Sequence, residues 1–111
     1  MDSTRQQKVA RLIQKDLAEI LRSRSRQFGK GVIISVTVVR VTPDMGMAKV
    51  YLSIFPPEKS QDAYGLIEKA GISLRYDLGK LVGKQLRIIP ELRFYLDDSL
   101  DYAERIDDLL K

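Results

Sequence analysis

The segment EKAGISLRYDLGKLVG, residues 68–83, is the part of the sequence that most strongly determines the predicted fold. The segment continues a series of apolar residues at helical spacing: Ala63, Leu66, Ile67, Ala70, Leu74, Leu78, Leu81 and Val82. Gly71, Gly79 and Gly83 interrupt it, although an interior glycine costs a helix about 1 kcal/mol relative to alanine. The pattern predicts one helix that bends near Gly71 and ends at Gly83, where glycine serves as a C-terminal cap.

A second helical series lies at the beginning of the chain, from about Ser3 to Arg24. Its apolar residues recur on one helical face: Val9, Leu12, Ile13, Leu17, Ile20 and Leu21. Lysines and arginines occupy the other faces, and Gly29 and Gly31 follow in a segment that breaks the helix. We therefore expect an amphipathic helix with a basic outer surface.

Apolar, mostly β-branched residues alternate with polar ones in two further segments, Val32–Val41 and Met47–Phe55. The turn sequence Pro43-Asp44-Met45-Gly46 separates them, so together they predict a β-hairpin. The side chains expected to face the core are Val32, Ile34, Val36 and Val38 in the first strand and Ala48, Val50, Leu52 and Ile54 in the second. The alternation slips at Val39, which suits a β-bulge or a strand end.

Prolines mark the remaining strand boundaries. Pro56-Pro57 ends the second strand because proline cannot donate to a β-ladder, and Pro90 precedes a third strand around Leu92–Leu96. Helical spacing returns in residues 99–111. The order helix, strand, strand, bent helix, strand, terminal helix predicts a single α+β domain, residues 1–111, with helices on one face of a three-stranded sheet. The other face should contact water.

Charge is distributed unevenly along the chain. Residues 1–30 hold eight lysines and arginines against three acidic residues, a net charge of +5, whereas residues 97–111 have a net charge of −4. The whole chain has a formal net charge of +4. A dense basic segment favours polyanions, either nucleic acid or an anionic membrane surface.

Several chemistries are excluded or disfavoured by composition. Cysteine and histidine are absent, which excludes disulfides, thiolate and imidazole metal ligands, and histidine-dependent triads. Asp97, Asp98, Asp101 and Glu104 resemble Mg²⁺ ligands, but the helix macrodipole alone favours acidic residues there, so we predict no metal site and no cofactor. No signal core and no apolar run of about 20 residues is present, and we expect a cytoplasmic protein.

Five segments, taken in order, form a recognisable series. They are Arg5-Gln6-Gln7-Lys8-Val9, QKDLAEIL (residues 14–21), VTPDMGMAKVYLS (residues 41–53), LRYDLGK (residues 74–80) and LRIIPELRFYLDDSL (residues 86–100). The last segment is the most specific, with a Pro-Glu-Leu-x-Phe and an Asp-x-Ser pattern. The series resembles the bacterial ribosome-binding factor A family over nearly the whole chain.

The resemblance implies a KH-like domain of type II topology that acts without catalysis. It also implies binding to free 30S small ribosomal subunits, assistance in late 16S rRNA maturation, and a role in cold adaptation. Family members lack the Gly-x-x-Gly loop with which KH domains clamp nucleotides, and have an Ala-x-Gly kink instead. This chain likewise has no Gly-x-x-Gly, and its counterpart of the kink, Ala70-Gly71-Ile72, places glycine one position earlier. We expect a monomer with no membrane partner and no small-molecule substrate.

Docking on rRNA would use lysines and arginines from the first helix and from the bent helix, which neutralise phosphates. The residues predicted to bind RNA are Arg5, Lys8, Arg11, Lys15, Lys69, Arg75, Lys80 and Lys84, with Arg22, Arg24 and Arg26 as second choices. Any one of them also suits an ordinary solvated surface, so the prediction rests on the cluster. Arg75 has a structural alternative, an ion pair with Asp77 or with an acidic residue near the C-terminus.

Two other functions fit the sequence less well. One is a protein-interaction or dimerisation module that uses the wet sheet face, with Tyr51, Tyr95 and Arg93 as anchors. The other is a small enzyme acting through carboxylates such as Asp97 and Asp98, which has neither histidine, cysteine nor a phosphate-binding glycine loop to support it.

Overall fold

The computed structural model describes residues 3–97 and orders them as the sequence predicts. The elements are α1 (Thr4–Ser23), α2 (Ser25–Phe28), β1 (Ile33–Val41), β2 (Met47–Phe55), the 3₁₀ turn η1 (Pro57–Lys59), α3 (Ser60–Lys69), α4 (Gly71–Val82) and β3 (Glu91–Leu96). The α+β class and the three-stranded sheet are confirmed. The expected terminal helix of residues 99–111 and the carboxylate of Asp98 lie outside the described residues.

The strand order is β1-β2-β3, with β1 antiparallel and β3 parallel to the central β2. The inward residues predicted in β2 are all buried. A bulge is present in β1, but it lies at Thr37, because Val36 pairs with Leu52 while Val38 pairs with Tyr51. The extra residue reverses the alternation earlier than expected, so the prediction for Val38 is wrong: its side chain is exposed, and Val39 is buried instead.

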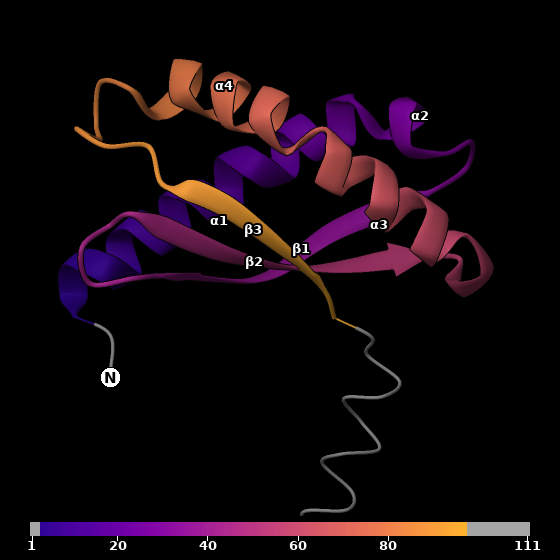
Figure 1. Ribbon diagram of the computed structural model, residues 1–111, viewed down its shortest axis with the longest axis horizontal. Coiled ribbons are helices and arrows are strands. Elements are labelled where there is room, and N and C mark those ends of the chain that lie inside the picture. Colours follow the sequence, from indigo (N-terminus) through magenta and orange to yellow (C-terminus); the bar gives the residue numbers. More distant parts are fainter. Residues whose placement is uncertain (1–2, 98–111) are drawn as a thin grey trace, which may run out of the picture.

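Helices cover one face of this sheet. Figure 1 shows α3 and α4 along one side of the strands, and the buried side chains of α1, α3, α4 and the strands form one apolar cluster. Outward residues at the far end of the hairpin, Ile33 and Phe55, are more than 60% exposed, at 63% and 62%. Within residues 3–97, the second face of the sheet is therefore uncovered, as the sequence predicts.

The long helix is broken at Ala70, which ends α3 and precedes α4. Ala70 has φ −87° and ψ 6°, a conformation open to L-residues, and φ is not positive at Gly71, Gly79 or Gly83. The bend thus falls where the sequence predicts, without needing the conformational freedom of glycine. Gly83 is required for space, since a Cβ there would lie 2.6 Å from the Gly79 carbonyl oxygen.

Gln6 connects the start of α1 to the end of β1. Its Oε1 accepts a hydrogen bond from the Ser3 N–H at 2.9 Å, and its N–H donates to Ser3 Oγ at 3.1 Å, which completes a capping box. Gln6 Nε2 donates to the buried Val41 carbonyl at 2.8 Å. Further along the helix, Gln14 Nε2 donates to the carbonyls of Val36 and Thr37. Two glutamines of α1 thereby donate hydrogen bonds to backbone carbonyls of the edge strand β1. These carbonyls cannot then accept hydrogen bonds from a strand of another chain, which limits edge-to-edge association.

Replacing Gln6 with leucine should lower the free energy of unfolding by about 1–3 kcal/mol, because the Val41 carbonyl loses its donor while staying buried. Urea denaturation of both proteins measures the difference. The control is Gln61→Leu, at an exposed position of α3, where the change should stay within about 0.5 kcal/mol. A Gln6→Leu protein as stable as the parent would contradict the role given to this side chain.

Candidate nucleic-acid interface

All eight residues predicted to bind RNA are exposed, but they do not form one continuous patch. Arg5 and Lys8 line one hollow, and Arg75 and Lys80 line another. The others, Arg11, Lys15, Lys69 and Lys84, line neither.

The first hollow, which we call the basic cleft, lies where the start of α1, the β1–β2 turn and the α4–β3 loop meet, at the left end of the molecule in Figure 1. Its volume is about 940 Å³. The lining residues are Thr4, Arg5, Lys8, Val9, Pro43, Asp44, Met45, Gln85, Leu86, Arg87 and Ile88. Three segments distant in sequence therefore contribute to one surface.

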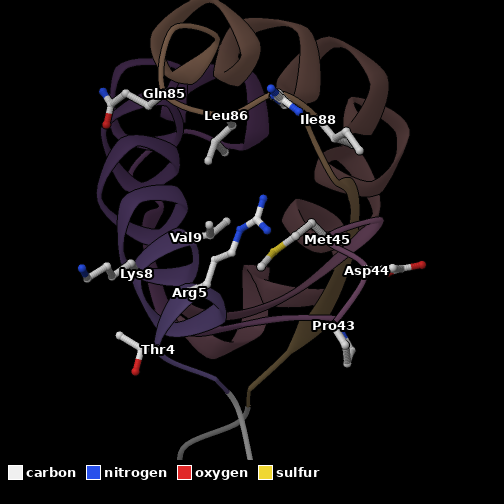
Figure 2. Close-up of a pocket in the computed structure, with 11 residues that line it drawn as sticks. Thr4, Arg5, Lys8, Val9, Pro43, Asp44, Met45, Gln85, Leu86 and Ile88 are labelled. Carbon is white, nitrogen blue, oxygen red and sulfur yellow. The ribbon is translucent and has the colours of Figure 1, made fainter.

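Apolar and basic side chains share the basic cleft. Figure 2 shows Arg5 extending into it beside Val9, with Met45 and Leu86 also directed inward, while Lys8 projects from its rim. In the described part of the chain, no ion pair involves Arg5, Lys8 or Arg87. These three cations are available to an anionic ligand beside an apolar floor.

Arg87 was not among the residues predicted from the sequence. It lies in the loop between α4 and β3, within the LRIIPEL segment, and nothing in the local pattern separates it from an ordinary loop cation. Its position opposite the start of α1 depends on how the α4–β3 loop returns across the molecule, which only the tertiary structure shows.

The β1–β2 turn forms one wall of the basic cleft. Met45 adopts a left-handed φ of 61°, at a turn position usually taken by glycine or asparagine. Hydrogen bonds from the Thr42 hydroxyl at 2.7 Å and the Gly46 N–H at 3.0 Å hold the pKa of Asp44 below its ordinary value. The Asp44 carboxylate thus stays ionised, but Figure 2 shows it directed away from the cleft. It is therefore not positioned to neutralise Arg5.

The second hollow, the α4 groove, has a volume of about 550 Å³ and is lined by Ile72, Arg75, Tyr76, Gly79, Lys80 and Ile89. Lys80 Nζ lies 4.6 Å from the ring centroid of Tyr76, a cation–π arrangement. Arg75 donates to the Ile89 carbonyl through Nε at 3.2 Å and Nη2 at 2.6 Å, so it holds the α4–β3 loop against the helix.

The suggested Arg75–Asp77 ion pair is absent among the described residues, and Asp77 pairs instead with Arg24 at 2.9 Å. The reason is helical geometry, since residues two positions apart point to different sides of a helix. Arg24 also lies over the Phe28 ring, and Arg22 pairs with Glu19. Two of the three second-choice arginines are thus engaged within the fold, whereas Arg26 is exposed without such an ion pair in residues 3–97.

The carboxylates considered as metal ligands are only partly described. Asp97 accepts a hydrogen bond from the Thr37 hydroxyl at 2.8 Å. Across residues 3–97, no three acidic side chains gather closely enough to hold a metal ion. Among the described helices, none has the length and apolarity needed to cross a membrane.

Solved structures share this architecture. Ribosome-binding factor A from Thermus thermophilus matches with a TM-score of 0.67 at 24% identity, over 82% of this chain and 94% of that one. A homology model of the Thermus thermophilus factor, fitted into the cryo-EM map of a complex of that protein with 30S, matches with a TM-score of 0.60 at 26% identity, over 76% and 86% of the two chains. The expected KH-like fold is confirmed.

Sequence comparison gives the same relationship. The family model described as Ribosome-binding factor A matches residues 5–110. Ribosome-binding factor A of Cytophaga hutchinsonii is 50% identical over 110 residues, which cover 99% of this chain and 83% of that protein. The Staphylococcus carnosus protein of the same name is 33% identical over 112 residues, covering 100% and 95%. The chain therefore belongs to the ribosome-binding factor A family.

Proposed function

We propose that this protein is a ribosome assembly factor that binds free 30S small subunits and assists late 16S rRNA maturation. Family membership supports the ribosomal partner, as does the structurally similar Thermus factor that has been fitted into a 30S complex. The basic cleft supports an RNA ligand. We place the docking contact there, at the meeting point of α1, the β1–β2 turn and the α4–β3 loop.

The observation that carries this proposal is the group of three cations without ion pairs in residues 3–97, Arg5, Lys8 and Arg87, around one hollow. Exposed cations without ion pairs stay hydrated, so they destabilise the folded protein little. They attract phosphates, and the counterions of the RNA are released when those phosphates are bound. The apolar floor at Val9 and Leu86 offers contact to a sugar or base between phosphates. Such a surface positions the protein through contacts to the phosphate backbone and the shape of the RNA, and it recognises few bases.

Assistance in maturation requires no bond to be made or broken by the protein. A factor that binds one rRNA conformation more tightly than its competitors raises the population of that conformation. We infer that the protein acts in this way as a monomer in the cytoplasm, where bacterial subunits assemble. Lys80 of α4 and Lys84, in the turn after α4, would extend the contact, whereas Arg75 serves mainly to hold the loop that carries Arg87.

The first test is the distribution of the protein in a cell extract separated on a sucrose gradient. We expect it to sediment with free small subunits and to be absent from mature ribosomes, with precursor 16S rRNA accumulating when the gene is deleted. Immunoblotting of the fractions and primer extension on the rRNA measure the two effects. Equal amounts on small subunits and mature ribosomes would contradict a role in assembly.

The second test concerns the basic cleft itself. Arg5→Gln combined with Arg87→Gln should weaken binding to purified small subunits about tenfold. It should also reduce the slope of log K against log salt concentration by about 1.4–1.8, because each lost phosphate contact removes about 0.7–0.9. Filter binding over a range of salt concentrations gives both values.

The matched control for the cleft variant is Arg26→Gln combined with Lys30→Gln. These residues are exposed in α2 and the loop after it, at the other end of the molecule from the basic cleft (Figure 1), and the change in net charge is identical. We expect its affinity to stay close to that of the parent protein. Equal losses in the two variants would show that net charge, and not the cleft, determines binding.

A further inference from the structure

The uncovered face of the sheet has an ordered arrangement of side chains. The strand pairing places Arg40 opposite Lys49, and Lys49 opposite Arg93, so that three cations form one row across all three strands. The next row contains Val38, Tyr51 and Tyr95. We call these the cationic row and the aromatic row. All three cations are exposed, and no helix of residues 3–97 covers them.

The cationic row works against the stability of the isolated protein. Like charges directly opposite one another on neighbouring strands repel. Of the three cations in the row, only Arg93 has an acidic partner among the described residues, Glu91 at 3.7 Å. Both side chains of that pair are more than half exposed, so the pair screens little of the repulsion. Arg40 and Lys49 have no ion pair within residues 3–97. An anion bound along the row would remove the repulsion.

The aromatic row offers a stacking surface beside those charges. The rings of Tyr51 and Tyr95 are stacked, with centroids 5.2 Å apart and planes inclined by 24°. Tyr95 lies on β3, an edge strand of the sheet that residues 3–97 form, so no strand of the described residues adjoins the ring face that is turned away from Tyr51. Adjacent rows on one face of a sheet are about 6.8 Å apart. A base and its own phosphate can therefore contact the two rows together.

We propose that this sheet face is a second RNA-binding surface, separate from the basic cleft, and that it takes an unpaired segment of RNA. One base stacks on the tyrosine pair, and the adjoining phosphates lie along Arg40, Lys49 and Arg93. The segment must be single-stranded, because bases within a duplex are already stacked on their neighbours. The inference rests on the proposed function only in that both surfaces bind RNA.

The charge of this face favours RNA over a second copy of this chain as its ligand. If a second copy of this chain bound face to face, the cationic row of one copy would approach the cationic row of the other. The described residues of this face include no row of acidic side chains that could neutralise those charges. A nucleic acid supplies both a negative charge at regular intervals and a planar ring. Both features of the face are thereby used by a single ligand.

The test uses the ¹⁵N-labelled full chain titrated with an oligoadenylate of about ten nucleotides, and with a duplex RNA of the same length. For the single strand, we expect amide shifts at Arg40, Lys49, Tyr51, Arg93 and Tyr95. Tyr95→Leu should weaken its binding about tenfold and leave duplex binding unchanged. Leu66→Ala removes an exposed apolar side chain from α3, outside both proposed surfaces, and is the control, with unchanged affinity expected. Tyr95→Phe keeps the ring and should bind like the parent protein.

The charge contribution is tested with Arg40→Gln combined with Lys49→Gln. Because this change relieves repulsion, the thermal midpoint should be equal to or higher than that of the parent, so a failure to fold cannot explain lost binding. The slope of log K against log salt concentration for the single strand should fall by about 1.4. Shifts confined to the basic cleft, or full affinity in both Tyr95→Leu and the charge variant, would overturn the inference.

Two further outcomes separate this inference from its alternatives. A concentration-dependent dimer in sedimentation equilibrium, abolished by the sheet variants, would identify the face as a dimer interface and overturn the RNA proposal. Oligoadenylate binding that persists in the Arg5→Gln and Arg87→Gln protein would support it. If the parent protein binds oligoadenylate at this face but fails to bind small subunits, the proposed function is wrong and the inference stands.

Discussion

Burial of one face of the central strand β2 is the constraint on which the rest of the structure depends. Ala48, Val50 and Leu52 are completely buried, so their neighbours on β2 must point to the opposite face. The strands on either side are aligned to β2 by its ladder, and this register brings Lys49 and Tyr51 into line with the outward residues of β1 and β3. Packing on one face thus fixes the chemical pattern of the other.

The fold uses some of its cations internally and leaves others unpaired. Arg24 joins the end of α1 to α4 through Asp77, and Arg75 secures the α4–β3 loop through a backbone carbonyl. Both are arginines, whose several N–H groups can bond at fixed angles while keeping the charge. The cations of the basic cleft make no ion pair within residues 3–97. Net charge alone does not distinguish the arginines that hold the fold together from the cations of the basic cleft. Their hydrogen-bond and ion-pair partners do.

Periodicity predicted the helices, the hairpin and the bend, because each is determined by short-range spacing and by the burial of one face. It misplaced the bulge, since Val38 and Val39 are equally apolar and the sequence offers no local reason to expose either one. The pairing of Asp77 and the site of Arg87 were out of reach for a different reason. Each depends on a contact between segments distant in sequence, which the spacing of residues does not encode.

The two surfaces proposed for RNA differ in both position and chemistry. The basic cleft lies among loops and the start of α1, whereas the aromatic and cationic rows lie on the uncovered side of the sheet. A rigid protein that holds an unpaired segment on one side and an rRNA backbone on another makes the second contact intramolecular once the first has formed. Only RNA conformations that place both elements at the correct separation gain the full binding energy. Such a pair of sites would select a tertiary arrangement of rRNA without reading much of its sequence.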